Sequence, residues 1–102
     1  MFRLRPSSFE WDEGKAEANL SKHGVSFMEA STVFFDGAAR IVDDTRHSVD
    51  EDRFFIVGHS VRGRILAVSF CYRGEGTLIR IISAREATRT ERGAYWRHLH
   101  AE

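Results

Sequence analysis

Arginine and carboxylate side chains alternate near the C-terminal end of the chain, in the stretch 79–96, IRIISAREATRTERGAYW. A guanidinium binds phosphate oxygens through paired N–H groups, and a nearby carboxylate can take or give a proton. Glu91 and Tyr95 are four residues apart, so on a helix they share one face. Arg85 and Arg89 have the same spacing, at which like charges repel unless an anion or carboxylate lies between them. The stretch predicts either an anion-binding site or the solvated face of an ordinary amphipathic helix.

Metal-free cleavage of RNA would use these residue types. The 2′-hydroxyl attacks the phosphorus, so a base must take its proton, cations must stabilise the transition state, and an acid must protonate the leaving 5′-oxygen. The predicted cations are Arg64, Arg80, Arg85 and Arg89. The candidate acid or base is Glu86, Glu91 or a histidine, and the sequence does not identify the general base.

Five histidines offer groups that titrate near physiological pH. His59 follows a predicted strand beside an arginine-rich turn, where it is expected to face the basic surface. His23 follows Lys22 at the end of a predicted helix, where the helix dipole explains it equally well. No Ser–His–Asp or Cys–His arrangement can be argued from spacing, and the sequence contains neither a P-loop nor a GxGxxG motif.

An acidic run lies in the middle of the chain and raises the question of a metal site, since hard cations bind clustered carboxylates. Its members are Asp43, Asp44, His47, Asp50, Glu51 and Asp52. The run lacks the central glycine and the terminal glutamate of a calcium-binding loop. We expect a solvated loop or a docking surface for a basic partner, with no metal and no cofactor.

Length and composition predict one domain spanning residues 1–102. Of the 102 residues 42% are hydrophobic, which suits a compact domain with one modest core. No apolar run reaches the length of a membrane span, and the first residues lack the apolar segment of a signal peptide. The single cysteine, Cys71, lies in an apolar run and is expected to be a core residue of a reduced, cytoplasmic protein.

The net charge is zero, but the two halves of the chain differ in sign. Residues 1–52 hold six basic and eleven acidic residues (−5), whereas residues 53–102 hold nine arginines and four glutamates (+5). Thirteen of the fifteen cations are arginine, which suits bidentate phosphate contacts better than lysine does. The basic half is therefore expected to bind an anionic partner.

Capping signals and hydrophobic periodicity predict an α+β fold. Asp12 and Gly24 bound a first helix over residues 13–22, and Ser26 with Glu29 opens a second helix that runs to about residue 35. Residues 38–83 alternate in the manner of strands and turns, which predicts a roughly four-stranded antiparallel meander. Ser83-x-x-Glu86 matches a capping box, so a third helix is expected to begin there and run to about residue 100.

Three segments together resemble the BrnT-type toxins, the ribonuclease half of a type II toxin–antitoxin pair with a RelE-like fold. The matching segments are FEWDEGKAEANLSKHGVSF at the start, EDRFFIVGHS in the middle and RIISAREATRTERGAYW near the end. They cover most of positions 9–96 in the expected order. The combination is specific, although any one segment alone would be weak.

The resemblance implies a cytoplasmic endoribonuclease that cleaves RNA without a metal, inhibits translation and growth, and is neutralised by an antitoxin. That antitoxin would be of the BrnA type, with a ribbon-helix-helix domain, in a dimer of heterodimers; the ribosome is a further candidate partner. Arg85 is the expected phosphate clamp, and the predicted catalytic set is Arg85, Arg64, Arg80, Glu91 and Tyr95. The predicted RNA-binding set is Arg89, Arg92, Lys22, His23 and His59. His23 can equally fix a helix end, and Glu91 and Tyr95 can equally hold the last helix against the sheet.

Two other functions fit the same residues. One is a non-catalytic module of this fold that binds RNA or a protein partner, which would show no cleavage product. The other is a metal-dependent hydrolase that uses the acidic run, which a chelator would inhibit.

Overall fold

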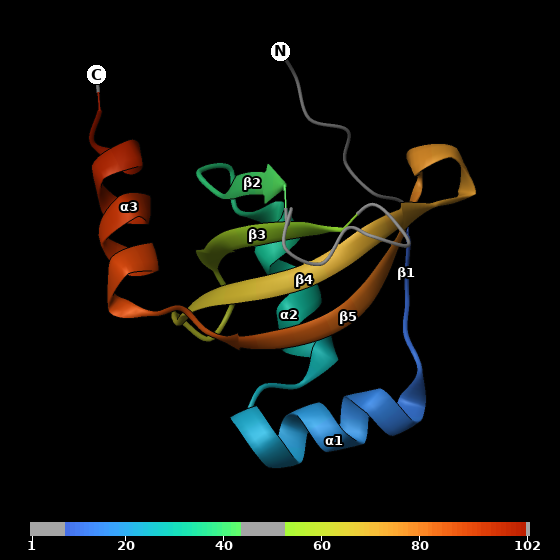
Figure 1. The fold of residues 1–102 in the computed structure, drawn as a ribbon. Coiled ribbons are helices and arrows are strands. Elements are labelled where there is room, and N and C mark those ends of the chain that lie inside the picture. The colour runs from blue at the N-terminus through green and yellow to red at the C-terminus, as the bar shows by residue number, and fades with distance from the viewer. Residues whose placement is uncertain (1–7, 44–52, 102) are drawn as a thin grey trace.

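The computed structural model describes residues 8–43 and 53–101 and has the predicted α+β class (Figure 1). Its elements in chain order are β1 (Ser8–Glu10), α1 (Glu13–His23), α2 (Phe27–Thr32), the 3-10 turn η1 (Val33–Phe35), β2 (Arg40–Asp43), β3 (Phe54–His59), β4 (Ile65–Arg73), the 3-10 turn η3 (Gly74–Gly76), β5 (Leu78–Glu86) and α3 (Arg89–Leu99). No helix in these ranges is long and apolar enough to cross a membrane.

The sheet is mixed and has the strand order β1-β5-β4-β3-β2 over the residues described. Strands β2 to β5 form the predicted antiparallel meander. Phe9-Glu10-Trp11 is typical of a short β segment, and β1 forms there, but it adds a fifth strand to the roughly four expected. It pairs in parallel with the start of β5, Phe9 opposite Ile79. This pairing joins the two ends of the chain, and no local sequence signal marks it.

The first two helices begin where the capping residues predict, and α1 also ends there. The second was expected to run to about residue 35, but α2 ends at Thr32 and continues only as the 3-10 turn η1. The Asp12 carboxylate accepts a hydrogen bond from the Lys15 N–H at 2.9 Å, and Gly24 ends α1 in the left-handed region at φ 71°. The Ser26 hydroxyl accepts from the Glu29 N–H at 3.0 Å and opens α2. Local hydrogen bonding therefore fixes both helices before the sheet is considered.

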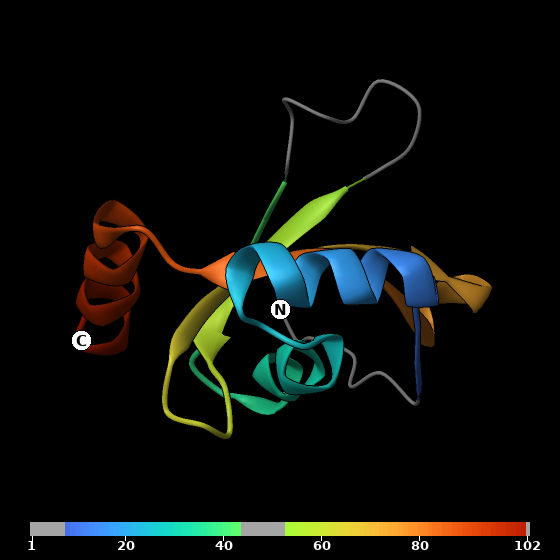
Figure 2. The same ribbon diagram turned by 90° about the horizontal axis from the view of Figure 1, so that it is seen from below.

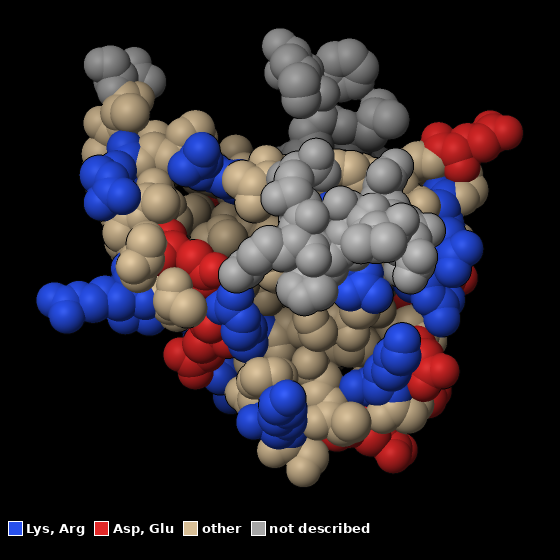
Figure 3. Space-filling model, in the orientation of Figure 1, with Lys and Arg blue, Asp and Glu red and all other residues tan. Residues whose placement is uncertain are grey.

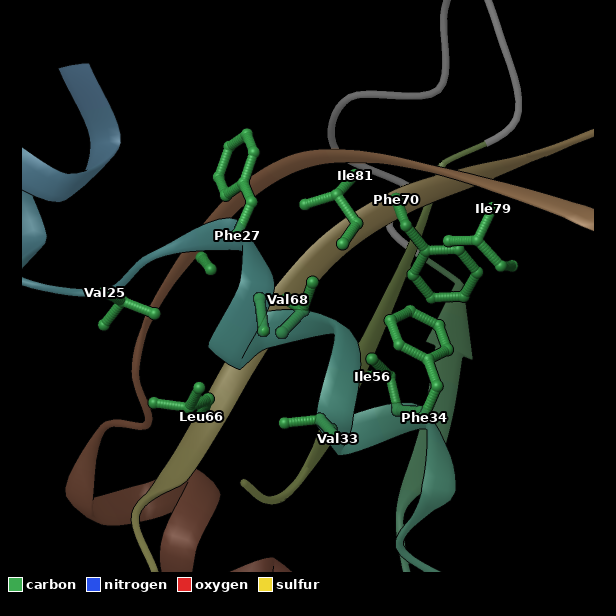
Figure 4. Packing of buried hydrophobic residues seen from close by; sticks show 12 residues of the cluster. Val25, Phe27, Val33, Phe34, Ile56, Leu66, Val68, Phe70, Ile79 and Ile81 are labelled. Atoms are coloured by element: carbon green, nitrogen blue, oxygen red, sulfur yellow. The ribbon is translucent and has the colours of Figure 1, made fainter. Parts of the chain in front are cut away.

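The main core lies between α2 and one face of the sheet, while α1 runs alongside β5 (Figures 1 and 2). The side chains of α2 and η1 point toward those of β3, β4 and β5 (Figure 4). The residues of α2 and η1 that face the sheet are all buried: Phe27, Ala30, Val33 and Phe34. Cys71 is also buried, as expected.

The third helix begins later than the sequence predicts. Ser83 and Glu86 do not form a capping box, because β5 continues through both and pairs with β4 as far as Glu86 opposite Leu66. The capping box of α3 is instead formed by Thr88 and Glu91. The local capping pattern at Ser83 is overridden by the strand pairing, so Arg85 and Glu86 lie on a strand.

A bulge in β5 changes which of its side chains share a face. Ser69 pairs with Ser83 and the next residue, Phe70, pairs with Ile81, so Ile82 is an extra residue in β5. Arg80 and Arg85 are five residues apart, a spacing that puts side chains on opposite faces of a regular strand. Because of the bulge they lie opposite Cys71 and Ala67, which share a face of β4.

Asn19 joins α1 to the end of β5. Its side-chain N–H₂ group donates to the carbonyls of Val25 at 2.9 Å and Ala84 at 2.8 Å, and its oxygen accepts from the Ala84 N–H at 3.1 Å. The Asn19 amide thus satisfies both backbone groups of Ala84 on the side of β5 away from β4. Since Asn19 is 7% exposed, water does not replace these bonds.

Asn19→Ala is expected to lower the free energy of unfolding by about 3 kcal/mol, because it leaves the buried Ala84 groups unpaired. Chemical denaturation followed by circular dichroism measures the change. Ser21→Ala, at an exposed position of the same helix, is the control and is expected to stay within about 0.5 kcal/mol of the native chain. An equal loss in both variants would contradict this role for Asn19.

Candidate active site

Arg85 and Glu91 form an ion pair where β5 gives way to α3. The Arg85 Nη1 and Nη2 groups donate to the two Glu91 oxygens at 2.8 and 3.0 Å, and the Glu91 Oε1 also accepts from the Thr88 N–H at 2.8 Å. The Arg85 guanidinium lies over the Phe55 ring, 5.8 Å from its centroid. Hydrogen bonding to Arg85 lowers the pKa of Glu91, and that pairing raises the pKa of Arg85. Both groups are therefore charged at neutral pH.

A second cluster links η1, β3 and α3 through Asp36, His59 and Tyr95. The Tyr95 hydroxyl donates to Asp36 Oδ2 at 2.8 Å and lies 3.0 Å from His59 Nδ1. Asp36 also accepts from the backbone N–H groups of His59 and Ala38. Burial acts to raise the pKa of Asp36, but these backbone bonds and the Tyr95 hydroxyl hold it below its ordinary value. Burial and the Asp36 charge raise the pKa of Tyr95 to about 12, so its hydroxyl remains protonated at neutral pH.

The hydrogen bonds of Tyr95 determine where His59 holds its proton. The single hydroxyl hydrogen of Tyr95 goes to Asp36, so its oxygen accepts from His59 Nδ1–H. A neutral His59 in this arrangement carries its free electron pair on Nε2. His59 is partly exposed and also contacts the ring of Trp96, with centroids 5.5 Å apart. His59 is therefore suited to accept a proton through Nε2.

A cavity of about 140 Å³ lies between α3 and the sheet face that carries these residues. Its lining residues are Arg40, Val42, Phe55, Val57, Glu91, Ala94 and Tyr95. Glu91 and Tyr95 therefore do share a helix face, as predicted, and both line the cavity. Arg40 is an exposed cation at this cavity, and it was not among the predicted site residues. The available signal was its spacing: Arg40 and Val42 are two residues apart, so in a strand their side chains lie on one face.

Arg64 is held by one buried carboxylate, that of Glu29, and by two exposed acceptors. It immediately precedes β4, and its Nε and Nη2 groups donate to Glu29 at 3.0 and 2.6 Å. It also donates to Glu86 at 3.2 Å and to the Gly24 carbonyl at 3.0 Å. The bond from Arg64 holds the pKa of Glu29 below its ordinary value, against the effect of burial. Ser60 donates to the same carboxylate at 2.7 Å, so Arg64 ties α1, α2 and the β3–β4 turn together.

Arg80 lies near the opposite end of β5. Its Nη1 donates to Glu10 on β1 at 2.8 Å, and Arg73 lies 3.8 Å from the same carboxylate. Arg80 and Arg85 lie opposite Cys71 and Ala67, two residues that are about 13 Å apart at the rise of a regular strand. The structure thus brings Arg85, Glu91, Tyr95 and His59 to one region and leaves Arg80 outside it.

The predicted RNA-binding residues lie at the end of the sheet where α3 begins. Arg89 is exposed in the first turn of α3, and Arg92 donates to the Ala87 carbonyl at 2.8 Å. Lys22 and His23 are exposed in the last turn of α1, which ends near the same end of the sheet (Figures 1 and 2). Figure 3 shows Lys and Arg side chains over α3 with Asp and Glu side chains beside it, so positive and negative groups are mixed on this face.

Comparisons with known proteins agree with this fold. The sequence profile of the family described as "Ribonuclease toxin, BrnT, of type II toxin-antitoxin system" matches residues 11–91. The chain belongs to the BrnT family. Among solved structures, the ribonuclease toxin BrnT of Brucella abortus is similar, with 26% sequence identity and a TM-score of 0.61 over 80% of this chain and 97% of that one. A search of curated proteins gave no match.

Family membership confirms the resemblance read from the three segments. The chain is a ribonuclease toxin of a type II toxin–antitoxin system, which implies an antitoxin partner.

The matched range ends at Glu91 and so includes the Arg85–Glu91 pair, while Tyr95 lies beyond it. Asp36 was not predicted as a site residue, since it follows the predicted end of the second helix at about residue 35; only the fold brings it to Tyr95. Of the predicted acidic run, Asp43 ends β2, and the other members, within residues 44–52, lie outside the described residues.

Tyr95→Phe is expected to lower the free energy of unfolding by about 1–2 kcal/mol, because Asp36 loses a buried donor and His59 loses its partner. Denaturant unfolding measures the loss. Tyr72→Phe is the matched control, since Tyr72 is 41% exposed on β4 and the change should cost about 0.5 kcal/mol or less. An equal loss of unfolding free energy in Tyr95→Phe and Tyr72→Phe would contradict a stabilising role for the Tyr95 hydrogen bonds.

Glu91→Gln is expected to destabilise this BrnT-family chain at neutral pH and to have less effect in acid. The pKa of Glu91 is lowered from 4.5 in the folded chain, so its contribution is present above pH 4.5 and is lost as the pH falls through the lowered value. Thermal unfolding of native and E91Q chains between pH 7 and pH 3 tests this, with exposed Glu17→Gln as the control. A native-to-E91Q difference that stays constant across this range would contradict it.

Proposed function

We propose that the chain is a metal-independent endoribonuclease that cleaves RNA by attack of the 2′-hydroxyl and leaves a 2′,3′-cyclic phosphate. The site is the α3 end of the sheet, around Arg85 and His59. One observation carries the proposal: in this BrnT-family chain, the charged guanidinium of Arg85 and the His59 ring each contact a residue that lines the same cavity. Arg85 contacts Glu91 and Phe55, and His59 contacts Tyr95 through Nδ1, which leaves Nε2 without a hydrogen bond to the described residues. RNA cleavage in the cytoplasm would inhibit translation and growth.

Arg85 is the proposed phosphate clamp. Two of its N–H groups, Nε–H and the second hydrogen of Nη2, have no hydrogen bond to any residue in 8–43 or 53–101. Both can donate to phosphate oxygens while Glu91 keeps the guanidinium plane fixed. Glu91 is then a positioning residue, because its lowered pKa makes it a weak base.

His59 is the proposed general base, acting through Nε2 on the 2′-hydroxyl. Tyr95, with a pKa of about 12, is too weak an acid to protonate the leaving oxygen readily. Its proposed role is to hold the His59 ring and its tautomer, with Asp36 behind it. After transfer, the protonated His59 can return the proton to the leaving 5′-oxygen.

In this proposal Arg64 and Arg80 support the fold through their protein partners and do not hold the cleaved phosphate. Arg64 donates through all three of its nitrogens to protein acceptors, and Arg80 pairs with Glu10 away from the cavity. Arg89, Arg92, Lys22 and His23 are proposed to bind RNA phosphates on either side of the cleaved bond, where exposed cations supply affinity without sequence preference.

The proposed partner is an antitoxin of the BrnA type, with a ribbon-helix-helix domain, assembled with the toxin as a dimer of heterodimers. Family membership supports an antitoxin, and the finer description follows from the resemblance. Two apolar side chains on α3, Trp96 at 41% and Leu99 at 40% exposure, are proposed as its contacts. The ribosome is proposed as the setting in which cleavage is fast.

The alternative is a non-catalytic module that binds RNA or a partner. It is favoured by the pairing of each predicted catalytic arginine: Arg85 with Glu91, Arg64 with Glu29 and Arg80 with Glu10. A metal-dependent hydrolase would draw on the acidic run, and in the part of the chain that the structure describes no group of three metal-binding side chains occurs.

Arg85→Ala is expected to reduce RNA cleavage at least about a hundredfold, because the transition-state charge loses its donor. Labelled RNA is incubated in excess EDTA with the native chain, with R85A and with Arg62→Ala, a control at an exposed turn arginine. The native chain and R62A should give 2′,3′-cyclic phosphate ends.

The other outcomes separate the alternatives. Equal cleavage by native and R85A chains would remove Arg85 from the mechanism. Cleavage that is absent in EDTA and restored by magnesium would indicate the metal-dependent hydrolase. No cleavage in either condition, even with ribosomes added, would favour the non-catalytic module.

A further inference from the structure

The cavity between α3 and the sheet has mostly apolar walls. Phe55 and Val57 come from β3, Val42 comes from β2, and Ala94 with the ring of Tyr95 comes from α3. The volume is about 140 Å³. A cavity of about 150 Å³ with apolar walls admits a benzene molecule. The space therefore suits one planar six-membered ring.

The charges at this cavity suit a phosphate group that is attached to the bound ring. Arg40 lines it and is exposed, and within residues 8–43 and 53–101 its guanidinium has no acidic partner. Glu91 lines it too, but its negative charge is compensated by the two hydrogen bonds from Arg85. An anion that approaches the opening thus meets one uncompensated cation.

We infer that this cavity binds a single nucleobase of the RNA, with the phosphate of that nucleotide held by Arg40. The inference rests on the proposed ribonuclease function and adds a substrate subsite to it. Bases of unpaired RNA stack on aromatic side chains, and Phe55 and Tyr95 supply such rings here. Arg85 lies over Phe55, so a base in the cavity would place its neighbouring phosphodiester near the proposed clamp.

The test measures binding rather than cleavage. Native chain is titrated with each of the four nucleoside 5′-monophosphates and with ribose 5-phosphate, while NMR follows the methyl groups of Val42, Val57 and Ala94. At least one monophosphate should shift these signals in a saturable way. Ribose 5-phosphate, which lacks the base, should bind at least about tenfold more weakly, since stacking contributes on the order of 1–3 kcal/mol per base.

Ala94→Leu fills the cavity from α3 and should weaken monophosphate binding at least about tenfold. Ala18→Leu makes the same change at an exposed position of α1 and should leave binding unchanged. Val42→Leu is a second filling variant at a residue that is 44% exposed, so it tests the cavity even where A94L perturbs folding. Arg40→Ala should weaken binding of the monophosphate but not of the corresponding nucleoside.

The inference fails if no monophosphate shifts these methyl groups, if ribose 5-phosphate binds equally well, or if a folded filling variant binds like the native chain. Parallel cleavage assays keep this result separate from the proposed function. A native chain that binds a base here but cleaves no RNA, even with ribosomes added, would refute the ribonuclease proposal alone. A chain that cleaves RNA without binding a base here would refute the subsite alone.

Discussion

The pairing of β4 with β5 positions the residues on which the proposed chemistry depends. It continues to Glu86 opposite Leu66 and contains one extra residue, Ile82. The length of the ladder keeps Arg85 on a rigid strand, and the extra residue turns Arg85 to the face that carries the cavity. Ala87 extends the ladder by donating to the Ile65 carbonyl at 2.9 Å, so α3 begins immediately after the sheet ends. A shift of one residue in this register would turn Arg85 away from Glu91.

Carboxylates from the acidic half of the chain are distributed among the arginines of the basic half. Glu10 pairs with Arg80, and Glu29 pairs with Arg64. Each of these pairs joins an N-terminal element to the sheet, so the charge difference between the halves contributes to the fold. Mixed signs therefore remain on the face shown in Figure 3. Specific unpaired N–H groups, rather than a broad basic surface, are what this face offers to an RNA phosphate.

Local signals predicted the helices and the meander, and long-range pairing accounts for the differences. Asp12, Gly24 and Ser26 act through hydrogen bonds within a few residues, so the sequence reveals them directly. The parallel partner of β1 lies some seventy residues away, Glu10 opposite Arg80, and has no local signature. The Ser83-x-x-Glu86 pattern locally favours the start of a helix, but pairing with β4 keeps both residues in β5.

The candidate site was predicted only in part, because the sequence reveals local relationships between residues and not long-range ones. Arg85, Glu91 and Tyr95 lie within one short segment, so spacing alone placed them together. Asp36 reaches Tyr95, and Arg40 reaches the cavity, only after the sheet has formed.

The Arg85–Glu91 pair links the stability of α3 to the proposed chemistry. Glu91 accepts from both Arg85 and the N–H of Thr88, so one carboxylate caps the helix and orients the guanidinium. A phosphate that bound Arg85 by displacing Glu91 would sacrifice an ion pair and loosen the start of α3. A phosphate that uses the remaining N–H groups keeps both contacts. Binding beside the carboxylate therefore costs less free energy than replacing it. This preference is consistent with the proposal that an arginine that is already paired serves as the clamp, and that Glu91 orients it without taking part in proton transfer.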